Sequence, residues 1–268
     1  MGLAVCATPI GNLEDVTLRV LRELAECDLV LCEDTRRTRG LLARHGVSAR
    51  VLSLHEHNEA SRIAALLPRL ESGERMALVS DAGLPGINDP GGRLVAAAVT
   101  AGVPVTVLPG PSAVETALVA SGLVGERYQF LGYLPRGAGA LRSLWEELAR
   151  WPHPAVAFES PRRLPGSLAS LAEALPDRPA AVCRELTKQF EEVVRGTAAE
   201  LGARFREPPR GEITLVIGSG VAIRVGEDEV AIDAVRELVA GGLARRAAAA
   251  LVARLTGGSA NRLYRGSL

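Results

Sequence analysis

The sequence is poor in aromatic residues and cysteine, and each shortage argues against a class of protein. Phe, Trp and Tyr make up 3% of the 268 residues, so extensive stacking of bases on aromatic rings is excluded. The four cysteines include no C-x-x-C pair, which argues against a disulfide framework and a cysteine zinc site. The apolar runs are far shorter than the roughly 20 residues that cross a bilayer. No basic segment precedes the first apolar run, so we expect no signal peptide and a cytoplasmic protein.

The chain also has no excess of charge of either sign, because 31 basic residues balance 31 acidic ones. The protein is therefore no polycation, and any contact with nucleic acid must be a local patch. Lysine is nearly absent: Lys188 is the single lysine, and the other basic residues are arginines. Hydrophobic residues at 47% and charged residues at 23% are typical of a globular protein and exclude disorder as the main state.

The first part of the chain, residues 1–119, alternates short apolar runs with amphipathic stretches. This alternation, with short connections, predicts an α/β domain with a largely parallel sheet. The expected strands are residues 3–8, 28–32, 50–54, 76–80 and 103–108.

The second part, residues 120–218, has more strands per helix and predicts a mixed sheet. Its expected strands are residues 128–134, 155–158, 180–183, 191–194 and 212–217, and its expected helices are residues 139–151, 164–175 and 198–205. Thr197 with Glu200 fits a capping box for the last helix, as Ser112 with Glu115 does earlier.

Glycine-rich residues 218–226 read as a linker before a small helical segment, residues 227–268. Its second half, residues 241–268, carries five arginines and no acidic residue. We therefore expect two α/β domains followed by a small basic helical tail.

Three loops follow predicted strands of the first domain and lead towards helices. They are residues 7–13, residues 80–92 and residues 109–115. The middle one holds four glycines and two aspartates, and it exceeds the usual strand-to-helix connection of roughly two to six residues. Because ligands bind at the carboxyl ends of strands in open α/β sheets, the three loops predict one ligand cleft. None of them is a dinucleotide fingerprint or a P-loop.

Two further segments follow strands of the first domain. Glu33 and Asp34 precede a run of arginines that suits a phosphate-bearing substrate, although a solvated helix start explains the charges equally well. His55 and His57 form an H-x-H pair, but no third ligand stands at a convincing spacing, so we expect no metal.

In the second domain, residues 158–163 and 184–192 each lie just past a predicted strand. Lys188 in the latter segment stands alone in a chain that otherwise uses arginine. An ammonium is compact and its pKa falls on burial, whereas a guanidinium stays charged. Codon bias would also leave a stray lysine, but a chemical role is the stronger interpretation.

Taken in order, the motifs resemble a known family. They read A-T-P-I-G-N-L-E-D, C-E-D-T-R, H-x-N-E, S-D-A-G-x-P-x-I-x-D-P-G, P-G-P-S-A, F-x-G-Y-L-P-R, F-E-S-P-R-R and R-E-L-T-K-x-F-E-E, ending in G-E-I-T-L-V-I-G. The order resembles the family of ribosomal RNA small subunit methyltransferases I, within the tetrapyrrole-methylase-like group. The resemblance covers residues 3–218 and, more weakly, the tail.

The resemblance implies S-adenosylmethionine as methyl donor, no metal, and a cytidine ribose 2′-hydroxyl in the decoding centre of 16S ribosomal RNA as acceptor. It implies a homodimer of two-domain subunits, with the donor cleft between the two α/β domains and the small ribosomal subunit as partner. The positions matching the family's donor cleft are Pro9, Ser80, Asp81, Ala82, Gly83, Leu84, Ser112 and Ala113. The chain departs from the family pattern at Leu84, where threonine is usual, and at Asn88, where serine is usual. It departs again in the tail at Gly258 and Ala260.

Methyl transfer to a hydroxyl needs the acceptor oxygen in line with the methyl group and a group that takes the proton. The candidates for the proton acceptor are Lys188 with a lowered pKa, Glu185, Glu33 and Asp34. Expected contacts with the substrate come from Arg36, Glu159, Arg162 and Arg184, with the arginines on flanking phosphates.

Three other functions stay open. A methylase of a corrin or porphyrin ring is disfavoured because such relatives typically begin with G-x-G-x-G-D, where this chain has residues 7–12. A noncatalytic RNA-binding module would leave the three ligand loops without a purpose. A nucleotide-dependent oxidoreductase lacks its dinucleotide fingerprint.

Overall fold

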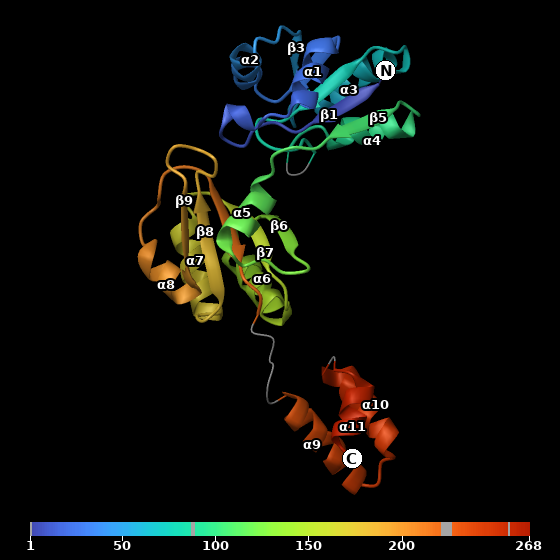
Figure 1. The fold of residues 1–268 in the computed structure, drawn as a ribbon, viewed down its shortest axis with the longest axis vertical. Coiled ribbons are helices and arrows are strands. Elements are labelled where there is room, and N and C mark those ends of the chain that lie inside the picture. The colour runs from blue at the N-terminus through green and yellow to red at the C-terminus, as the bar shows by residue number, and fades with distance from the viewer. Residues whose placement is uncertain (1, 87–88, 221–226, 257) are drawn as a thin grey trace. The chain divides into compact units, whose positions relative to one another are not determined.

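A computed structural model describes residues 2–86, 89–220, 227–256 and 258–268. Asn88 and most of the predicted linker, residues 221–226, lie outside this described part. The chain divides into two compact units, Met1–Ser219 and Gly220–Leu268. The first unit holds two five-stranded sheets and the second is helical (Figure 1).

The first sheet is entirely parallel, with strand order β3-β2-β4-β1-β5. Its strands are β1 Leu3–Cys6, β2 Leu29–Cys32, β3 Val51–Ser53, β4 Met76–Val79 and β5 Val105–Leu108. Every residue of β1, β2 and β4 is buried, as expected for central strands covered by helices on both faces. The prediction of a parallel α/β sheet is confirmed.

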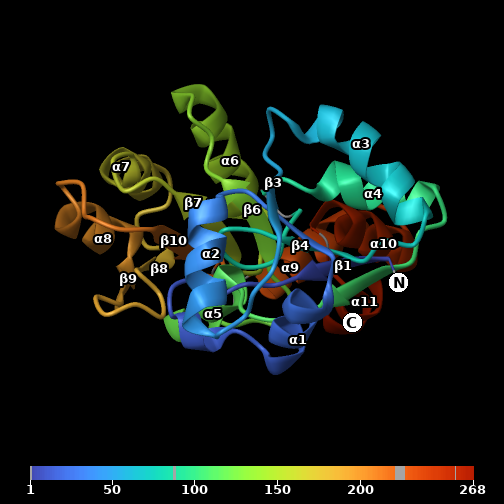
Figure 2. The same ribbon diagram turned by 90° about the horizontal axis from the view of Figure 1, so that it is seen from above.

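Alternate strand residues supply the two faces of this sheet, because successive side chains point in opposite directions. Leu3 and Val5 pack on the face covered by α3 and α4, while Ala4 and Cys6 pack on the face covered by α1 and α2. Figure 2 shows α3 and α4 side by side, with α1 and α2 on the other side of the strands. These helices span α1 Leu18–Glu26, α2 Thr35–Arg44, α3 Glu59–Glu71 and α4 Gly92–Thr100, and a short 3-10 turn covers Leu13–Asp15.

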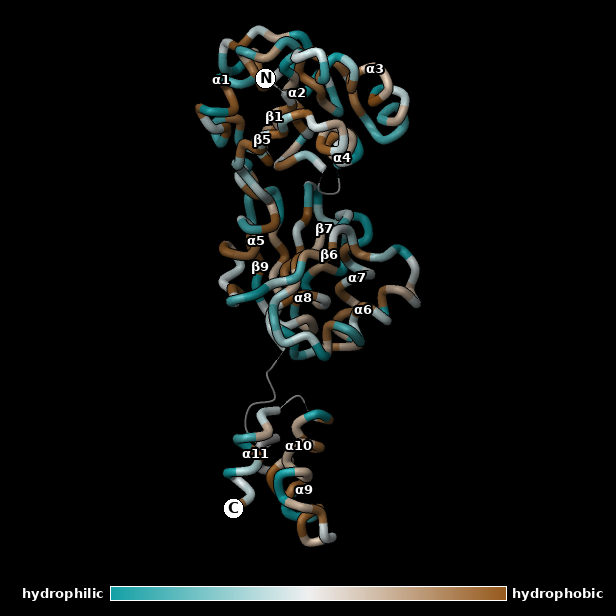
Figure 3. The backbone as a smooth tube through the Cα atoms, turned by 90° about the vertical axis from the view of Figure 1, so that its right-hand side faces the viewer, coloured by the Kyte–Doolittle hydropathy of each residue, from teal (hydrophilic) through white to brown (hydrophobic). Residues whose placement is uncertain are grey.

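The second sheet is mixed, with strand order β6-β7-β10-β8-β9, and only the β6–β7 pair is parallel. The strands are β6 Gln129–Tyr133, β7 Ala155–Glu159, β8 Pro179–Arg184, β9 Glu192–Thr197 and β10 Ile213–Ile217. One face packs against α6 Ala138–Arg150, α7 Leu164–Ala174 and α8 Ala198–Arg204. In Figure 3 the helices alternate hydrophobic and hydrophilic segments, as amphipathic helices on a sheet require.

Helix α5, Ala113–Ser121, packs on the opposite face of the second sheet. Its Val114, Ala117 and Leu118 join a cluster with β7, β8 and β10, and Ile10 from the first predicted loop belongs to the same cluster. The helix leaves the end of the first sheet and covers the second, so it connects the two. The domain boundary at residue 119 stays a prediction.

The two predicted capping boxes have different outcomes. At α8 the Thr197 side chain accepts from the Glu200 backbone and the Glu200 carboxylate accepts from the Thr197 backbone, which confirms the prediction. At α5 the prediction is wrong, because Ser112 makes no cap bond to the backbone and donates instead to the Glu115 carboxylate. Ser112 therefore leaves the first backbone N–H groups of α5 without a side-chain cap.

The helical unit contains α9 Glu227–Ala240, α10 Arg245–Thr256 and α11 Ala260–Gly266 around its own small apolar core. Val235 and Leu263 are among the most buried residues of this core. Arg236 and Arg245 donate to carbonyl groups near the end of α11, which ties the last helix to the first two. Within the described residues, no helix combines the length and the apolar character needed to cross a membrane.

Candidate functional site

The first and second predicted loops lie together at the carboxyl ends of β1 and β4. Thr8 and Gly83 exchange two backbone hydrogen bonds of 2.9 and 3.0 Å, and the Thr8 hydroxyl donates to the Ser80 carbonyl at 2.9 Å. Gly83 has φ +78°, a conformation that glycine adopts without strain. Because β1 and β4 are parallel neighbours, two loops whose contacting residues Thr8 and Gly83 are 75 residues apart in sequence form one rim of the site.

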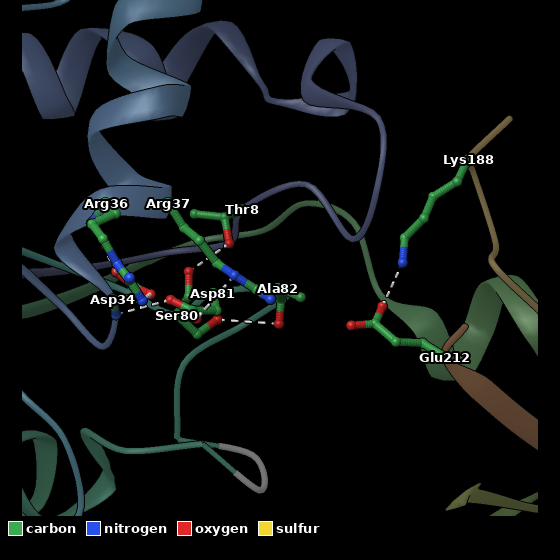
Figure 4. A network of polar contacts seen from close by, with 9 residues as sticks. All are labelled: Thr8, Asp34, Arg36, Arg37, Ser80, Asp81, Ala82, Lys188 and Glu212. Atoms are coloured by element: carbon green, nitrogen blue, oxygen red, sulfur yellow. Dashed lines mark hydrogen bonds and ion pairs between the residues drawn. The ribbon is translucent and has the colours of Figure 1, made fainter. Parts of the chain in front are cut away.

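Asp81 joins this rim to the end of β2. One carboxylate oxygen accepts from the Asp34 backbone N–H at 3.0 Å, and the other lies 3.6 Å from Arg37 Nε (Figure 4). Asp34 itself caps α2 and pairs with Arg36 at 2.7 Å, contacts that hold the pKa of Asp34 well below its usual range. Both aspartates therefore also hold the loops in place.

Acidic side chains gather beside this rim. Burial, Glu33 and Asp81 raise the pKa of Asp89 to about 6, although a hydrogen bond with Ser80 acts in the opposite direction. Burial and the nearby Asp81 likewise raise the pKa of Glu33. A concentration of carboxylates with raised pKa values is typical of a site built to receive a cation or a proton.

The loop after β8 meets the loop after β1. Glu185 and Thr187 adopt left-handed conformations, with φ of 51° and 66°, which non-glycine residues rarely do. The Thr187 hydroxyl accepts from the Asn12 backbone N–H at 3.0 Å. A Cβ at Gly11 would lie 2.5 Å from Lys188 Cγ, so only glycine fits there. Such local strain, maintained by tight packing, is typical of functional sites.

Lys188 donates to two carboxylates, Glu185 at 2.8 Å and Glu212 at 2.7 Å. Burial by itself would lower the pKa of Lys188, but these two hydrogen bonds outweigh it and the pKa is raised. The expectation of a lowered pKa for Lys188 is therefore wrong. Hydrogen bonds from the ammonium and from the Glu212 backbone also lower the pKa of Glu185.

Two cavities adjoin at this point. The larger, of about 650 Å³, lies between the loops of the first sheet and strands β6, β7 and β10. It takes in five of the eight expected donor residues, namely Ala82, Gly83, Leu84, Ser112 and Ala113. The smaller, of about 330 Å³, takes in Pro9, Ser80, Asp81 and Ala82 together with Arg37, Lys188 and Glu212. The structure therefore brings all three predicted loops to one pair of neighbouring cavities.

The larger cavity has an aromatic wall that sequence reasoning missed. Of the nine aromatic residues in the chain, four line it, namely Tyr128, Phe130, Tyr133 and Phe158. The Phe158 ring makes edge contacts with Phe130 at 5.1 Å and with Tyr133 at 5.5 Å. The signal in the sequence was their grouping at two neighbouring strands, β6 and β7, of an otherwise aromatic-poor chain. Glu212 and Asp89 also line the site and were not among the expected site residues.

The four residues expected to contact the substrate do not gather in one place. Arg36 is 87% exposed and paired with Asp34, and Arg162 is also exposed. Arg184 bonds to Glu192 and to the Arg210 carbonyl. Glu159 lines the larger cavity, but its carboxylate is buried and accepts from Ser167 and lies 3.3 Å from Arg163. Arg184 and Glu159 thus have structural partners, whereas Arg162 stays open to a ligand.

Metal ligation finds no support in the described part of the chain. No group of three or more His, Cys, Asp or Glu side chains there is arranged to hold a metal ion. His55 instead contacts the Asn58 side chain at 3.0 Å.

The family follows from comparison with known proteins. Residues 2–202 match the family model described as Tetrapyrrole (Corrin/Porphyrin) Methylases. The chain belongs to the tetrapyrrole methylase family. The resemblance inferred from the motifs is thereby confirmed at the level of the family.

Several curated proteins similar to the chain carry the name "Ribosomal RNA small subunit methyltransferase I". The protein of that name from Mesorhizobium japonicum is 43% identical over 98% of this chain and 90% of its own length. Its counterpart from Mycobacterium bovis is 47% identical over 90% of this chain and 85% of its own length. The one from Thermotoga maritima is 44% identical over 80% of this chain and 97% of its own length.

Solved tetrapyrrole methylase structures share the fold. The uroporphyrin-III C-methyltransferase of Thermus thermophilus, crystallised with S-adenosylhomocysteine, superposes with a TM-score of 0.59 at 19% identity. The match covers 84% of this chain and all of that one. A diphthine synthase gives a TM-score of 0.60 at 15% identity, over 81% of this chain and 90% of that one. At these identities the likeness establishes the two-sheet fold and says nothing of the substrate.

Proposed function

We propose that the protein transfers a methyl group from S-adenosylmethionine to a cytidine ribose 2′-hydroxyl in the ribosomal RNA of the small subunit. One observation carries the proposal: the three predicted loops surround one pair of cavities, in a chain that aligns almost end to end with ribosomal RNA small subunit methyltransferases. The assembled subunit as substrate, a homodimer and a cytoplasmic location belong to the same proposal.

The larger cavity suits the donor. Its volume of about 650 Å³ lies in the range of drug-sized ligand sites, roughly 300–1,000 Å³. The rings of Tyr133 and Phe158 offer surfaces for adenine and for the sulfonium, since cations are attracted to aromatic faces. Asp89 and Glu115, which also line this cavity, add negative charge that a cationic ligand needs. The donor would supply an activated methyl group, and the residues around it bind and orient.

The smaller cavity suits the acceptor. Its lining combines Arg37 and Lys188, which can attract a phosphate, with Glu212, which can accept a hydrogen bond from a ribose hydroxyl. At about 330 Å³ it has room for little more than one nucleoside, so the target nucleotide would leave its stack to enter.

Further contacts with RNA would come from basic side chains outside the cavities. Arg162 is exposed close to the larger cavity, and in the helical unit Arg246, Arg254 and Arg265 are exposed. Exposed arginines in either unit can attract RNA although the formal net charge of the chain is zero.

The decisive experiment supplies labelled S-adenosylmethionine and small ribosomal subunits from a strain that lacks the modification. We expect label in the RNA that survives nuclease digestion as a 2′-O-methylated cytidine. Label on a base, on protein or nowhere would refute the proposal. Sedimentation of the protein alone checks the homodimer.

A corrin or porphyrin ring is the second candidate acceptor, because the family model bears the name of these substrates. The same labelling assay with uroporphyrinogen in place of the subunits separates the two candidates. We expect no label in the ring.

A further inference from the structure

Glu212 lies on the wall shared by the two cavities. Of the residues that the structure describes, Ile10, Ala82 and Glu212 contribute to the lining of both, and among these three Glu212 alone has an ionisable side chain. The residue directly precedes β10, and its side chain is 66% exposed. Figure 4 shows the carboxylate on the side of its strand that faces Ala82, across from the Asp81 rim. A group in this place can reach an acceptor in one cavity beside a donor in the other.

The position of Glu212 is held on three sides. Its Oε2 accepts from Lys188 Nζ at 2.7 Å, and its backbone N–H and carbonyl bond to Glu185 at 2.9 and 3.0 Å. The preceding Gly211 has φ +98°, and a Cβ there would lie 2.4 Å from Glu185 Cγ. Glu212 Oε1 has no hydrogen-bond partner among the described residues, so one carboxylate oxygen is left for a ligand.

The other candidates for the proton acceptor are already engaged. The Lys188 ammonium lies between two carboxylates, which favour its protonated form. Glu185 Oε1 accepts two hydrogen bonds from within the protein, and the Asp34 carboxylate caps α2 and pairs with Arg36. Glu33 lines neither cavity. Glu212 is the carboxylate that combines a place at both cavities with an oxygen free to accept a proton.

We propose that Glu212 Oε1 takes the proton from the acceptor hydroxyl during methyl transfer, and that Lys188 is the positioning residue that orients its carboxylate. This inference rests on the proposed function. The hydroxyl oxygen forms a bond to the methyl carbon while the carbon–sulfur bond breaks. The electron pair of that bond stays on sulfur, which becomes a neutral thioether. The hydroxyl proton passes to Glu212 and then to water. A hydroxyl becomes strongly acidic as its oxygen gains the third bond, so a carboxylate is a sufficient base.

The first test compares Glu212→Gln with Glu212→Asp and with Glu147→Gln, a control at an exposed residue of α6. We expect Glu212→Gln to lower the single-turnover rate on small subunits about 100-fold or more, as loss of a general base does. Glu212→Asp, which keeps a carboxylate, should recover part of the rate, and Glu147→Gln should match the wild type. The affinity for S-adenosylhomocysteine, measured by calorimetry, should stay within about threefold in all variants, because this thioether lacks the sulfonium charge that a lining carboxylate would attract.

A second readout does not depend on activity. Since Lys188 is the only lysine, a chain free of tag lysines and labelled with ¹³C-lysine gives one ammonium-bearing side-chain signal, whose titration reports the Lys188 pKa. We expect Glu212→Gln to lower that pKa, because one of the two carboxylates beside the ammonium loses its charge. Lys188→Met should reduce the methyl transfer rate. The variant that combines Lys188→Met with Glu212→Gln should be no slower than Glu212→Gln alone, because both changes disable the same ion pair.

The outcomes separate the two proposals. A wild-type enzyme that methylates no ribose refutes the proposed function. A wild-type enzyme that does, together with a Glu212→Gln variant within about threefold of its single-turnover rate, overturns the role of Glu212. An unchanged Lys188 titration in Glu212→Gln overturns the positioning role of Lys188.

Discussion

Replacing Asp89 with asparagine tests the charge balance of the site through protein stability. Burial and the neighbouring Glu33 and Asp81 raise the pKa of Asp89 from 3.8 to about 6. The folded protein therefore holds this proton more tightly than the unfolded chain does. The stability contributed by the proton is present in full below about pH 4 and is lost as the pH rises through about 6. At neutral pH the ionised carboxylate costs folding free energy that an uncharged asparagine avoids.

The magnitude follows from the size of the shift. A change from 3.8 to about 6 corresponds to at most about 3 kcal/mol, at 1.36 kcal/mol per pKa unit. Asp89 is only half-buried, so solvent screening reduces the expected gain to about 1–2 kcal/mol. For a protein of this size, that gain raises the melting temperature by roughly 2–8 °C.

The assay is thermal unfolding of Asp89→Asn and wild type at about pH 8 and about pH 5. We expect the full gain at the higher pH and about half of it at the lower, where the wild-type carboxyl is protonated in the folded state. Asp177→Asn, at an exposed residue outside both cavities, is the control and should gain nothing. A variant no more stable than wild type at about pH 8, or an equal gain at both pH values, would refute the reasoning. The variant should also bind the cationic donor about tenfold more weakly, because the removed charge faces its cavity.

The remaining predictions concern the loops, the lysine and the tail. Asp81→Ala should lower the melting temperature slightly, because the backbone N–H of Asp34 loses its acceptor, and should weaken donor binding in calorimetry indirectly, because the same loop carries Ala82 and Gly83 into the larger cavity; unchanged affinity would separate Asp81 from the donor site. Gly11→Ala should cost about 1–3 kcal/mol in urea unfolding, because its Cβ would lie 2.5 Å from Lys188 Cγ; a neutral effect would contradict the tight packing of the two loops. With Lys188 as an ammonium of raised pKa, the methyl transfer rate should stay flat from about pH 7 to about pH 9, and a rise with pH would restore lysine as the base. Deleting residues 220–268 should weaken RNA binding and flatten its salt dependence without loss of donor affinity, and an unchanged salt slope would assign the tail a structural role.

Much of the fold could be predicted because its signals are local. Ten short apolar runs between amphipathic stretches predicted the ten strands, since burial and side-chain alternation act over a few residues at a time. The loops around Thr8 and Gly83 were predicted as ligand loops because glycine, proline and aspartate follow a strand there. The prediction of a capping box at Ser112 was wrong, because the side chains of Ser112 and Glu115 bond to each other. The spacing of the two residues alone does not distinguish that contact from a cap.

By itself the sequence determined the α/β class, the family and the loops that border the site, because each depends on the order of residues along the chain. Only the tertiary structure brought Gly11 against Lys188 and placed Glu212 between two cavities. The loops that carry Gly11 and Lys188 lie about 175 residues apart in the sequence. Their contact depends on how the two sheets and helix α5 pack together. The protonation state of Lys188 was decided in the same way. Burial, which the sequence suggested, would lower its pKa, but the two carboxylates that the fold brings to the ammonium raise it.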